Sequence, residues 1–241
     1  MPVRGDFLVI GSGIAGLRAA LSLAEFGRVI ILTKADPRES NTGYAQGGIA
    51  AALGDDDSPA LHAQDTMAAG DGLCLPAAVD VVVHEGPRYV TELMEWGAAF
   101  DRDAGGRPAL GREAAHSVRR VLHARDATGR EIGRLMWQRA AVHPRIHALG
   151  DAQAMAVLVS GGACTGALFV GADGRLERAE AAATLIATGG AGQVFRETTN
   201  PAIATGDGVA MAFAAGARVA DAEFVQFHPT ALSVEGAPRS C

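Results

Sequence analysis

The first 32 residues alternate between short apolar runs and a glycine-rich turn. An apolar run at Phe7–Ile10 is followed by the turn Gly11-Ser12-Gly13-Ile14-Ala15-Gly16, an Ala- and Leu-rich stretch at 17–26, and a second apolar run at 28–32. The order strand, glycine turn, helix, strand predicts the first βαβ unit of a doubly wound parallel sheet.

The remaining pattern adds helices in the middle of the chain and hairpins towards its end. Residues 35–54 are rich in glycine and polar side chains, which predicts a long loop followed by a helix of small residues. Helical patterns follow at 58–69, 76–96 and 127–140, and we expect the second helix to break near Gly86-Pro87 because proline disrupts helix interiors. After Asp151, apolar runs separated by Gly161-Gly162 and Asp173-Gly174 predict hairpins. The chain is therefore expected to be an α/β protein with a central parallel sheet and an additional small β-sheet.

Charge and cysteine content exclude several classes of partner. The net charge is −6 and no basic run exceeds the pair Arg119-Arg120, which argues against a nucleic-acid surface. No apolar stretch reaches the 18 or so residues of a membrane span, and we expect no cleaved signal peptide. Cys74, Cys164 and Cys241 are widely spaced, which fits a reducing, cytoplasmic compartment better than a disulfide framework or a zinc site. The histidines show no metal-ligand spacing, and we assign no metal.

The glycine motif at residues 11–16 predicts a dinucleotide site. Gly11 permits a tight turn, Gly13 lets the backbone approach a pyrophosphate, and Gly16 lets helix and strand pack closely. The following helix offers free N–H groups and a partial positive charge to phosphates. The second strand ends in Thr33-Lys34, where an acidic residue commonly binds ribose, so the motif alone leaves FAD, NAD and NADP open.

Further motifs identify a family. The run at 11–17, the Thr33-Lys34 strand end, Tyr44–Ala50, Ala187–Gly190, Thr205–Gly208 and Gln226–Thr230, in this order, resemble the succinate dehydrogenase/fumarate reductase flavoprotein family. Within that family, the chain is most similar to the branch that oxidises L-aspartate. The resemblance implies a Rossmann-like FAD-binding domain and FAD as the cofactor, since Thr33-Lys34 is a usual strand end in this family.

The resemblance also implies which residues hold FAD. The expected set is Gly11, Ser12, Gly13, Ile14, Ala15, Gly16 and Lys34 at the ADP half; Asn41, Thr42, Gly43, Tyr44, Ala45, Gln46, Gly47 and Gly48 along the isoalloxazine and pyrophosphate; Ala154 and Met155 near the adenine; Gly189 and Gly190 at another strand end; and Asp207 on the flavin side. Asp207 fits a helix N-cap equally well, and the two roles are compatible. Flavinylated members carry a histidine at the position of Asn41, so FAD is expected to be non-covalent.

Substrate recognition is expected from Gln226, His228 and Glu113, which we take as the catalytic-site residues. By resemblance, His228 hydrogen-bonds a substrate carboxylate with Gln226 close by; without the resemblance, a histidine before proline indicates a structural turn. Glu113 stands where succinate-oxidising members carry a neutral side chain, and a carboxylate there would attract the α-ammonium of aspartate. A solvated loop acid is the alternative for Glu113. Ala114, Ala115 and Val118 depart from the family pattern.

The implied reaction is the FAD-dependent oxidation of L-aspartate to iminoaspartate, with O₂ or fumarate as the electron acceptor. Iminoaspartate would pass to quinolinate synthase, at the start of NAD biosynthesis. The alternatives are a fumarate reductase or succinate dehydrogenase-type flavoprotein, and a FAD-binding fragment without turnover. We expect residues 1–232 to form the N-terminal part of the FAD-binding domain and 233–241 to begin a truncated capping region, so that this chain alone is an incomplete enzyme.

Overall fold

The computed structural model describes residues 2–227, which divide into two compact units. The first unit contains the chain up to Tyr44 and from Met136 onward, and the second contains Ala45–Leu135. No helix within residues 2–227 is long and apolar enough to cross a membrane.

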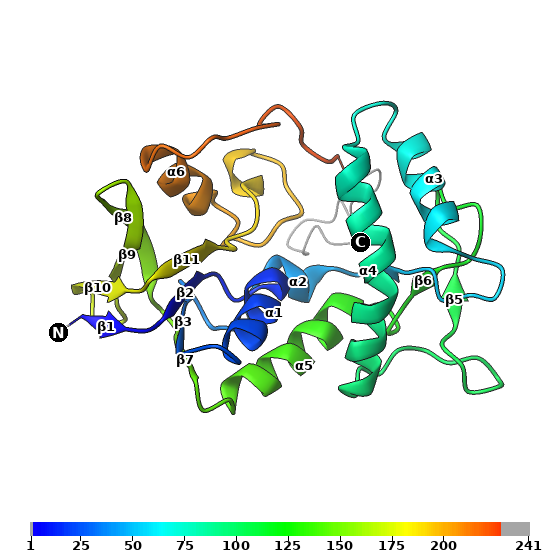
Figure 1. Cartoon of the computed structure of the whole chain (residues 1–241), viewed down its shortest axis with the longest axis horizontal. Coiled ribbons are helices and arrows are strands. Elements are labelled where there is room, and N and C mark those ends of the chain that lie inside the picture. Colours follow the sequence, from blue (N-terminus) through cyan, green and yellow to red (C-terminus); the bar gives the residue numbers. More distant parts are fainter. Residues whose placement is uncertain (1, 228–241) are drawn as a thin grey trace. The chain divides into compact units, whose positions relative to one another are not determined.

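The first unit is built on a four-stranded parallel sheet in the order β11-β2-β3-β7 (Figure 1). Its strands are β2 (Phe7–Ile10), β3 (Val29–Leu32), β7 (Ile146–Leu149) and β11 (Ala183–Ile186). Helix α1 (Ile14–Leu23) connects β2 to β3 and buries Leu17 and Ala20. All four residues of β3 are buried, which explains the unbroken apolar run in the sequence. The predicted βαβ unit is confirmed.

A second sheet completes the core of this unit, in the order β1-β10-β9-β8. It consists of β1 (Val3–Arg4), β8 (Gln153–Ser160), β9 (Ala163–Val170) and β10 (Leu176–Glu180). The predicted turns are confirmed: Gly161, Gly162 and Gly174 have φ angles of 59°, 79° and 76°, which glycine adopts without steric cost. Phe169 packs with Leu8 and Leu32 of the parallel sheet and with Met211 of helix α6 (Asp207–Ala214). A 3-10 turn, η1 (Gly192–Val194), precedes α6.

The second unit pairs two helices, α3 (Pro59–Ala69) and α4 (Pro76–Glu95), side by side in Figure 1. Ser58 caps α3 by accepting a hydrogen bond from the Leu61 amide at 3.1 Å. The expected break at Gly86-Pro87 is wrong, because α4 continues through both residues. Proline disfavours helical geometry at the preceding residue partly through that residue's Cβ, which Gly86 lacks. The buried face formed by Val83, Val90 and Leu93 then holds the helix together.

A three-stranded antiparallel sheet lies in the second unit, in the order β4-β6-β5. Its strands are β4 (Ile49–Ala50), β5 (Leu110–Gly111) and β6 (Val121–Leu122). The small-residue helix expected after the loop is wrong in length: residues 35–54 contain only the single turn α2 (Asn41–Tyr44), in the first unit, and β4. Helix α5 (Thr128–Ala141) leads back into the first unit.

Candidate functional site

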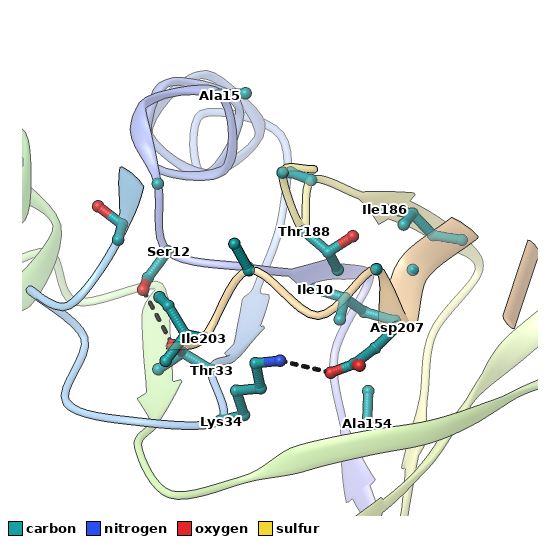
Figure 2. Close-up of a pocket in the computed structure, with 18 of the residues that line it drawn as sticks. Ile10, Ser12, Ala15, Thr33, Lys34, Ala154, Ile186, Thr188, Ile203 and Asp207 are labelled. Atoms are coloured by element: carbon teal, nitrogen blue, oxygen red, sulfur yellow. Dashed lines mark hydrogen bonds and ion pairs between the residues drawn. The ribbon is translucent and has the colours of Figure 1, made fainter. Parts of the chain in front are cut away.

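A cavity of about 650 Å³ lies in the first unit, at the carboxyl ends of β2, β3 and β11 (Figure 2). Its wall includes the strand ends Ile10, Leu32 and Ile186, the start of α1 and the start of α6. Ligands of open α/β sheets bind beyond the carboxyl ends of the strands, and cofactor sites commonly have volumes of about 300–1,000 Å³. The cavity therefore has the position and the size of a cofactor site.

Gly11 and Gly16 of the first motif have the packing roles that the motif predicts, and Gly13 lies in the cavity wall. Gly11 has a φ of 112°, and a Cβ on Gly11 would collide with the carbonyl of Ala187. A Cβ on Gly16 would collide with the carbonyl oxygen of Gly11, so this glycine permits close packing of α1 on β2. Gly13 lines the cavity, and a Cβ there would lie 3.5 Å from Thr42 Oγ1, at ordinary van der Waals distance.

The beginning of α1 faces the cavity without a side-chain cap. Gly13 is the N-cap residue and offers no side-chain acceptor. The Ile14 amide donates to Thr42 Oγ1 at 3.0 Å, which ties α1 to α2. The helix start therefore combines a partial positive charge with close backbone access, as a pyrophosphate requires.

Two polar contacts cross between elements at the cavity, and both are drawn in Figure 2. Ser12 Oγ donates to Thr33 Oγ1 at 3.0 Å, and both side chains are buried. Lys34 Nζ lies 2.6 Å from Asp207 Oδ2 and also donates to Thr205. These contacts fasten the end of β3 to the glycine turn and to the start of α6.

Asp207 is the first residue of α6, whereas Gly206 occupies the N-cap position with a φ of 78°. Burial raises the pKa of Asp207, but the hydrogen bonds from Lys34 and Thr205 outweigh burial and hold that pKa below its usual value. Lys34 is thus compensated by a carboxylate rather than left as a free cation. The N-cap role considered for Asp207 is therefore wrong: Gly206 is the N-cap residue, because this position has a left-handed conformation that glycine adopts without steric cost.

Most of the cofactor residues predicted in the first unit lie in the cavity wall. Those in the wall are Gly11, Ser12, Gly13, Ile14, Ala15, Lys34, Asn41, Thr42, Ala154, Gly189 and Asp207. Gly16, Gly43, Tyr44, Met155 and Gly190 belong to the same segments but are not among the wall residues. Tyr44 donates its hydroxyl to Glu39 at 2.9 Å, and the Met155 side chain is exposed.

The sequence prediction missed the apolar part of the wall. Ile10, Leu32, Ile186, Ile203 and Met211 line the cavity together with Arg218. Three of these residues are the last residues of parallel strands, and strand register aligns Ile10 with both Leu32 and Ile186. The last residue of each apolar run in the sequence could therefore have predicted Ile10, Leu32 and Ile186 as wall residues.

The other half of the glycine-rich motif, Ala45, Gln46, Gly47 and Gly48, lies in the second unit. Gly48 fits tightly against Val121 and Leu122 of β6, where a Cβ would collide, whereas Gly47 has no atom within 4 Å of a Cβ position. The Ala45 carbonyl accepts a hydrogen bond from the Gly129 amide at 3.0 Å.

The substrate residues are distributed over the chain. Glu113 lies on the loop between β5 and β6, half-exposed, with Oε1 2.9 Å from His123 Nε2. Gln226 is exposed in the irregular segment that follows α6. His228 and residues 233–241 lie outside the described residues.

The loop between β5 and β6 also carries Arg120, the centre of a buried charge cluster that the sequence did not predict. The Arg120 guanidinium is fully buried, with Asp57 at 2.9 Å and Asp65 at 2.7 Å. Asp65 also accepts hydrogen bonds from the Ser117 amide and hydroxyl. The backbone hydrogen bond from Ser117 is the main reason why the pKa of Asp65 is lowered. These contacts anchor the loop that carries Glu113.

The parallel sheet, the glycine turn and the cavity beyond the strand ends together define a dinucleotide-binding protein. Comparison with known families narrows this class. Residues 6–240 match the FAD binding domain family, and the chain belongs to that family. FAD is therefore the cofactor, in agreement with the expectation drawn from Thr33-Lys34.

Curated relatives agree over nearly the whole chain. It is 48% identical to "L-aspartate oxidase 2-a, chloroplastic" of Nicotiana tabacum, over 97% of this chain and 37% of the relative. It is also 48% identical to an L-aspartate oxidase of Nostoc, over 99% of this chain and 41% of the relative. The chain thus spans about two fifths of the length of these relatives.

Solved structures confirm the fold. A mutant of FrdA from E. coli quinol fumarate reductase is similar with a TM-score of 0.91 and 35% identity, covering 96% of this chain and 40% of the other. The Sdh1 complex of Mycobacterium smegmatis is similar with a TM-score of 0.86 and 32% identity, covering 89% of this chain and 39% of the other. The predicted fold class, an α/β FAD-binding domain with a parallel sheet and an additional small sheet, is confirmed.

Proposed function

We propose that this chain is the N-terminal, FAD-binding portion of an enzyme that oxidises L-aspartate to iminoaspartate. The observation that carries the proposal is the 48% identity to curated L-aspartate oxidases over 97–99% of the chain. Because the chain covers only about two fifths of those relatives, activity is proposed for the full-length protein. The chain alone binds FAD without completing a catalytic site.

The residues at the cavity fit FAD. The backbone at Gly13 and the uncapped start of α1 would receive the pyrophosphate, and the apolar strand ends Ile10 and Leu32 offer surface to the adenosine. Lys34 would contact the ADP half, and Asp207, whose Oδ2 lies 2.6 Å from Lys34 Nζ, would lie at the same part of the cofactor rather than at the separate flavin side expected from the resemblance. When bound, FAD supplies the hydride acceptor, and the protein supplies orientation and charge.

We further propose that FAD is held without a covalent bond. Asn41 lines the cavity, and its amide cannot act as the imidazole nucleophile of flavinylated relatives. Acid precipitation of the purified, yellow protein should release the flavin and leave a colourless pellet. A yellow pellet would contradict this role of Asn41, and a colourless protein that FAD cannot reconstitute would contradict FAD binding by this chain.

For the substrate, Glu113 is proposed to attract the α-ammonium group, and Gln226 and His228 to bind a carboxylate. Glu113 is accessible to a ligand because its side chain is half-exposed. Full-length protein mixed anaerobically with L-aspartate should lose its flavin absorbance, while succinate should have no effect. Bleaching by succinate alone would favour the fumarate reductase type, to which the chain is 35% identical.

The metabolic setting is part of the same proposal. Electrons would pass to O₂ or fumarate, and iminoaspartate would be consumed by quinolinate synthase in NAD biosynthesis. Cys74 and Cys164 are free thiols, which supports a reducing, cytoplasmic compartment.

A further inference from the structure

His123 lies just beyond the end of the middle strand of the small sheet in the second unit. It directly follows β6, and the register pairs Leu122 with both Ile49 of β4 and Leu110 of β5. Gly48 directly precedes β4, and the antiparallel register continued by one residue places it opposite His123. A Cβ on Gly48 would come within 2.9 Å of His123 Nε2, and a Cβ on Gly111 within 2.9 Å of Cε1. The imidazole thus occupies a slot that exists because two neighbouring positions are glycine.

From this slot the ring reaches Glu113. The distance from His123 Nε2 to Glu113 Oε1 is 2.9 Å. A carboxylate accepts hydrogen bonds, so in this contact the N–H of Nε2 donates a hydrogen bond to Glu113 Oε1. Within residues 2–227, the second oxygen, Oε2, has no recorded partner. Glu113 therefore has one oxygen fixed by the protein and one available to a ligand.

The loop that carries Glu113 is held near this residue through its backbone. It begins at Gly111 in β5, the His116 amide donates to the Glu113 carbonyl at 3.3 Å, and Arg112 Nε donates to the His116 carbonyl at 2.9 Å. The Ser117 amide then donates to Asp65 at 2.8 Å. Between these points, Ala115 adopts a left-handed φ of 66°, a conformation that costs a non-glycine residue energy. These contacts hold the backbone of the loop, whereas the contact with His123 holds the side chain of Glu113.

We propose that His123 is a positioning residue for recognition of the substrate amine. By holding Oε1, it would direct Oε2 of Glu113 towards an ammonium group, and its ring would fix Glu113 relative to Gly48 of the proposed flavin motif. The ligand class is an α-amino dicarboxylate. This inference rests on the proposed function, because it needs Glu113 to contact the substrate amine.

The test compares substrates with and without the amine in the full-length holoenzyme. His123→Phe keeps a ring in the slot but removes the donor, and His123→Gln keeps an N–H donor. His84→Gln, on the exposed face of α4, is the matched control. We expect His123→Phe to raise KM for L-aspartate about 10-fold, the size of one charge-assisted hydrogen bond, with kcat changed less than about 2-fold. His123→Gln should recover most of that loss.

Succinate separates amine recognition from general damage, because it has the carboxylates without the ammonium. Its dissociation constant, measured from the perturbation of the flavin spectrum, should change less than about 2-fold in His123→Phe. Gly111→Ala, which pushes on the ring from the neighbouring strand, should raise KM for L-aspartate in the same way.

Three results would overturn the inference: an unchanged KM in His123→Phe, an equal weakening of succinate and L-aspartate, or no recovery in a folded His123→Gln variant. A wild-type enzyme that fails to oxidise L-aspartate would instead refute the proposed function, so the two failures are distinguishable.

Discussion

The absence of a Cβ atom at three glycines shapes the proposed dinucleotide site. At Gly11 and Gly16 the space for a side chain is occupied by backbone, which cannot move aside as a flexible side chain would. Gly13 lies in the wall of the cavity, and a Cβ there would make ordinary van der Waals contact with Thr42 Oγ1 at 3.5 Å. Packing therefore requires glycine at positions 11 and 16, whereas an alanine at position 13 should leave the packing of α1 on β2 intact.

Gly16→Ala should destabilise the protein by about 1–3 kcal/mol, because the added methyl group overlaps the Gly11 carbonyl oxygen. Chemical denaturation of the ligand-free protein measures the change in unfolding free energy. Gly190→Ala is the control, since no atom lies within 4 Å of its Cβ position. Equal stability of the two variants would show that α1 shifts to accommodate the methyl group.

His62 gives the second unit a pH-dependent stability. Its side chain is buried, and Nδ1 has no hydrogen-bond partner. Burial chiefly lowers the pKa of His62, and the charges of Arg120 and His116 add to this effect, whereas the carboxylates of Asp57 and Asp65 act in the opposite direction. The unfolded chain therefore binds a proton more readily than the folded chain does.

It follows that the unfolding free energy should fall as the pH drops from 7 towards 5, since the proton binds the unfolded state first. In His62→Phe this fall should be smaller, whereas in His84→Gln it should match the wild type. Urea unfolding at a series of pH values provides the measurement. A wild-type slope retained in His62→Phe would place the titrating group elsewhere.

At the scale of elements, Arg120 joins three segments of the second unit. It pairs with Asp57, which precedes α3, and with Asp65 on α3, while its own backbone leads into β6. Such a buried network holds these segments in one arrangement, because separating the charges would leave each of them buried without a partner and would destabilise the fold. The loop with Glu113 is thereby held at a defined place relative to α3.

Arg120→Met should lower the unfolding free energy by about 3–5 kcal/mol, because it leaves the buried carboxylate of Asp57 without its cation. Adding Asp57→Asn and Asp65→Asn should recover part of this loss by removing the unpaired charges. Denaturation of the single and triple variants tests both statements. A triple variant less stable than Arg120→Met would contradict the unpaired-charge explanation.

For the whole molecule, the cavity is assembled from segments far apart in sequence. Residues around positions 10–15, 32–42, 152–154, 186–189 and 203–219 form its wall. Ligand binding must therefore stabilise the tertiary arrangement of the first unit, since no single segment forms the site.

FAD at 100 times its dissociation constant should raise the unfolding free energy by about 2.7 kcal/mol. ADP should also raise the melting temperature, because the glycine turn and the start of α1 that would receive its phosphates lie within the first unit. FMN, which lacks the AMP half, should stabilise less than FAD at equal concentration. A thermal scan in which FMN matches FAD would contradict this placement of the ADP half.

The sequence alone determined the βαβ start, the hairpins and the dinucleotide motif. Each depends on local geometry: strand burial gives an apolar run, and positive φ angles or close backbone contacts require glycine at fixed spacing. The two-residue strands β4, β5 and β6 were not predictable, because so few residues carry no periodicity. The α4 helix was mispredicted at Pro87, since the buried face of Val83, Val90 and Leu93 outweighs a local preference.

Only the tertiary structure decided which groups meet. Lys34 pairs with Asp207 across more than 170 positions, Arg120 is buried between Asp57 and Asp65, and His123 fills the slot beside Gly48 to reach Glu113. These pairings follow from strand register and from the need to compensate each buried charge. Neither strand register nor charge compensation is a property of one segment by itself, so the sequence could propose residues for the site but could not identify the partners that hold them.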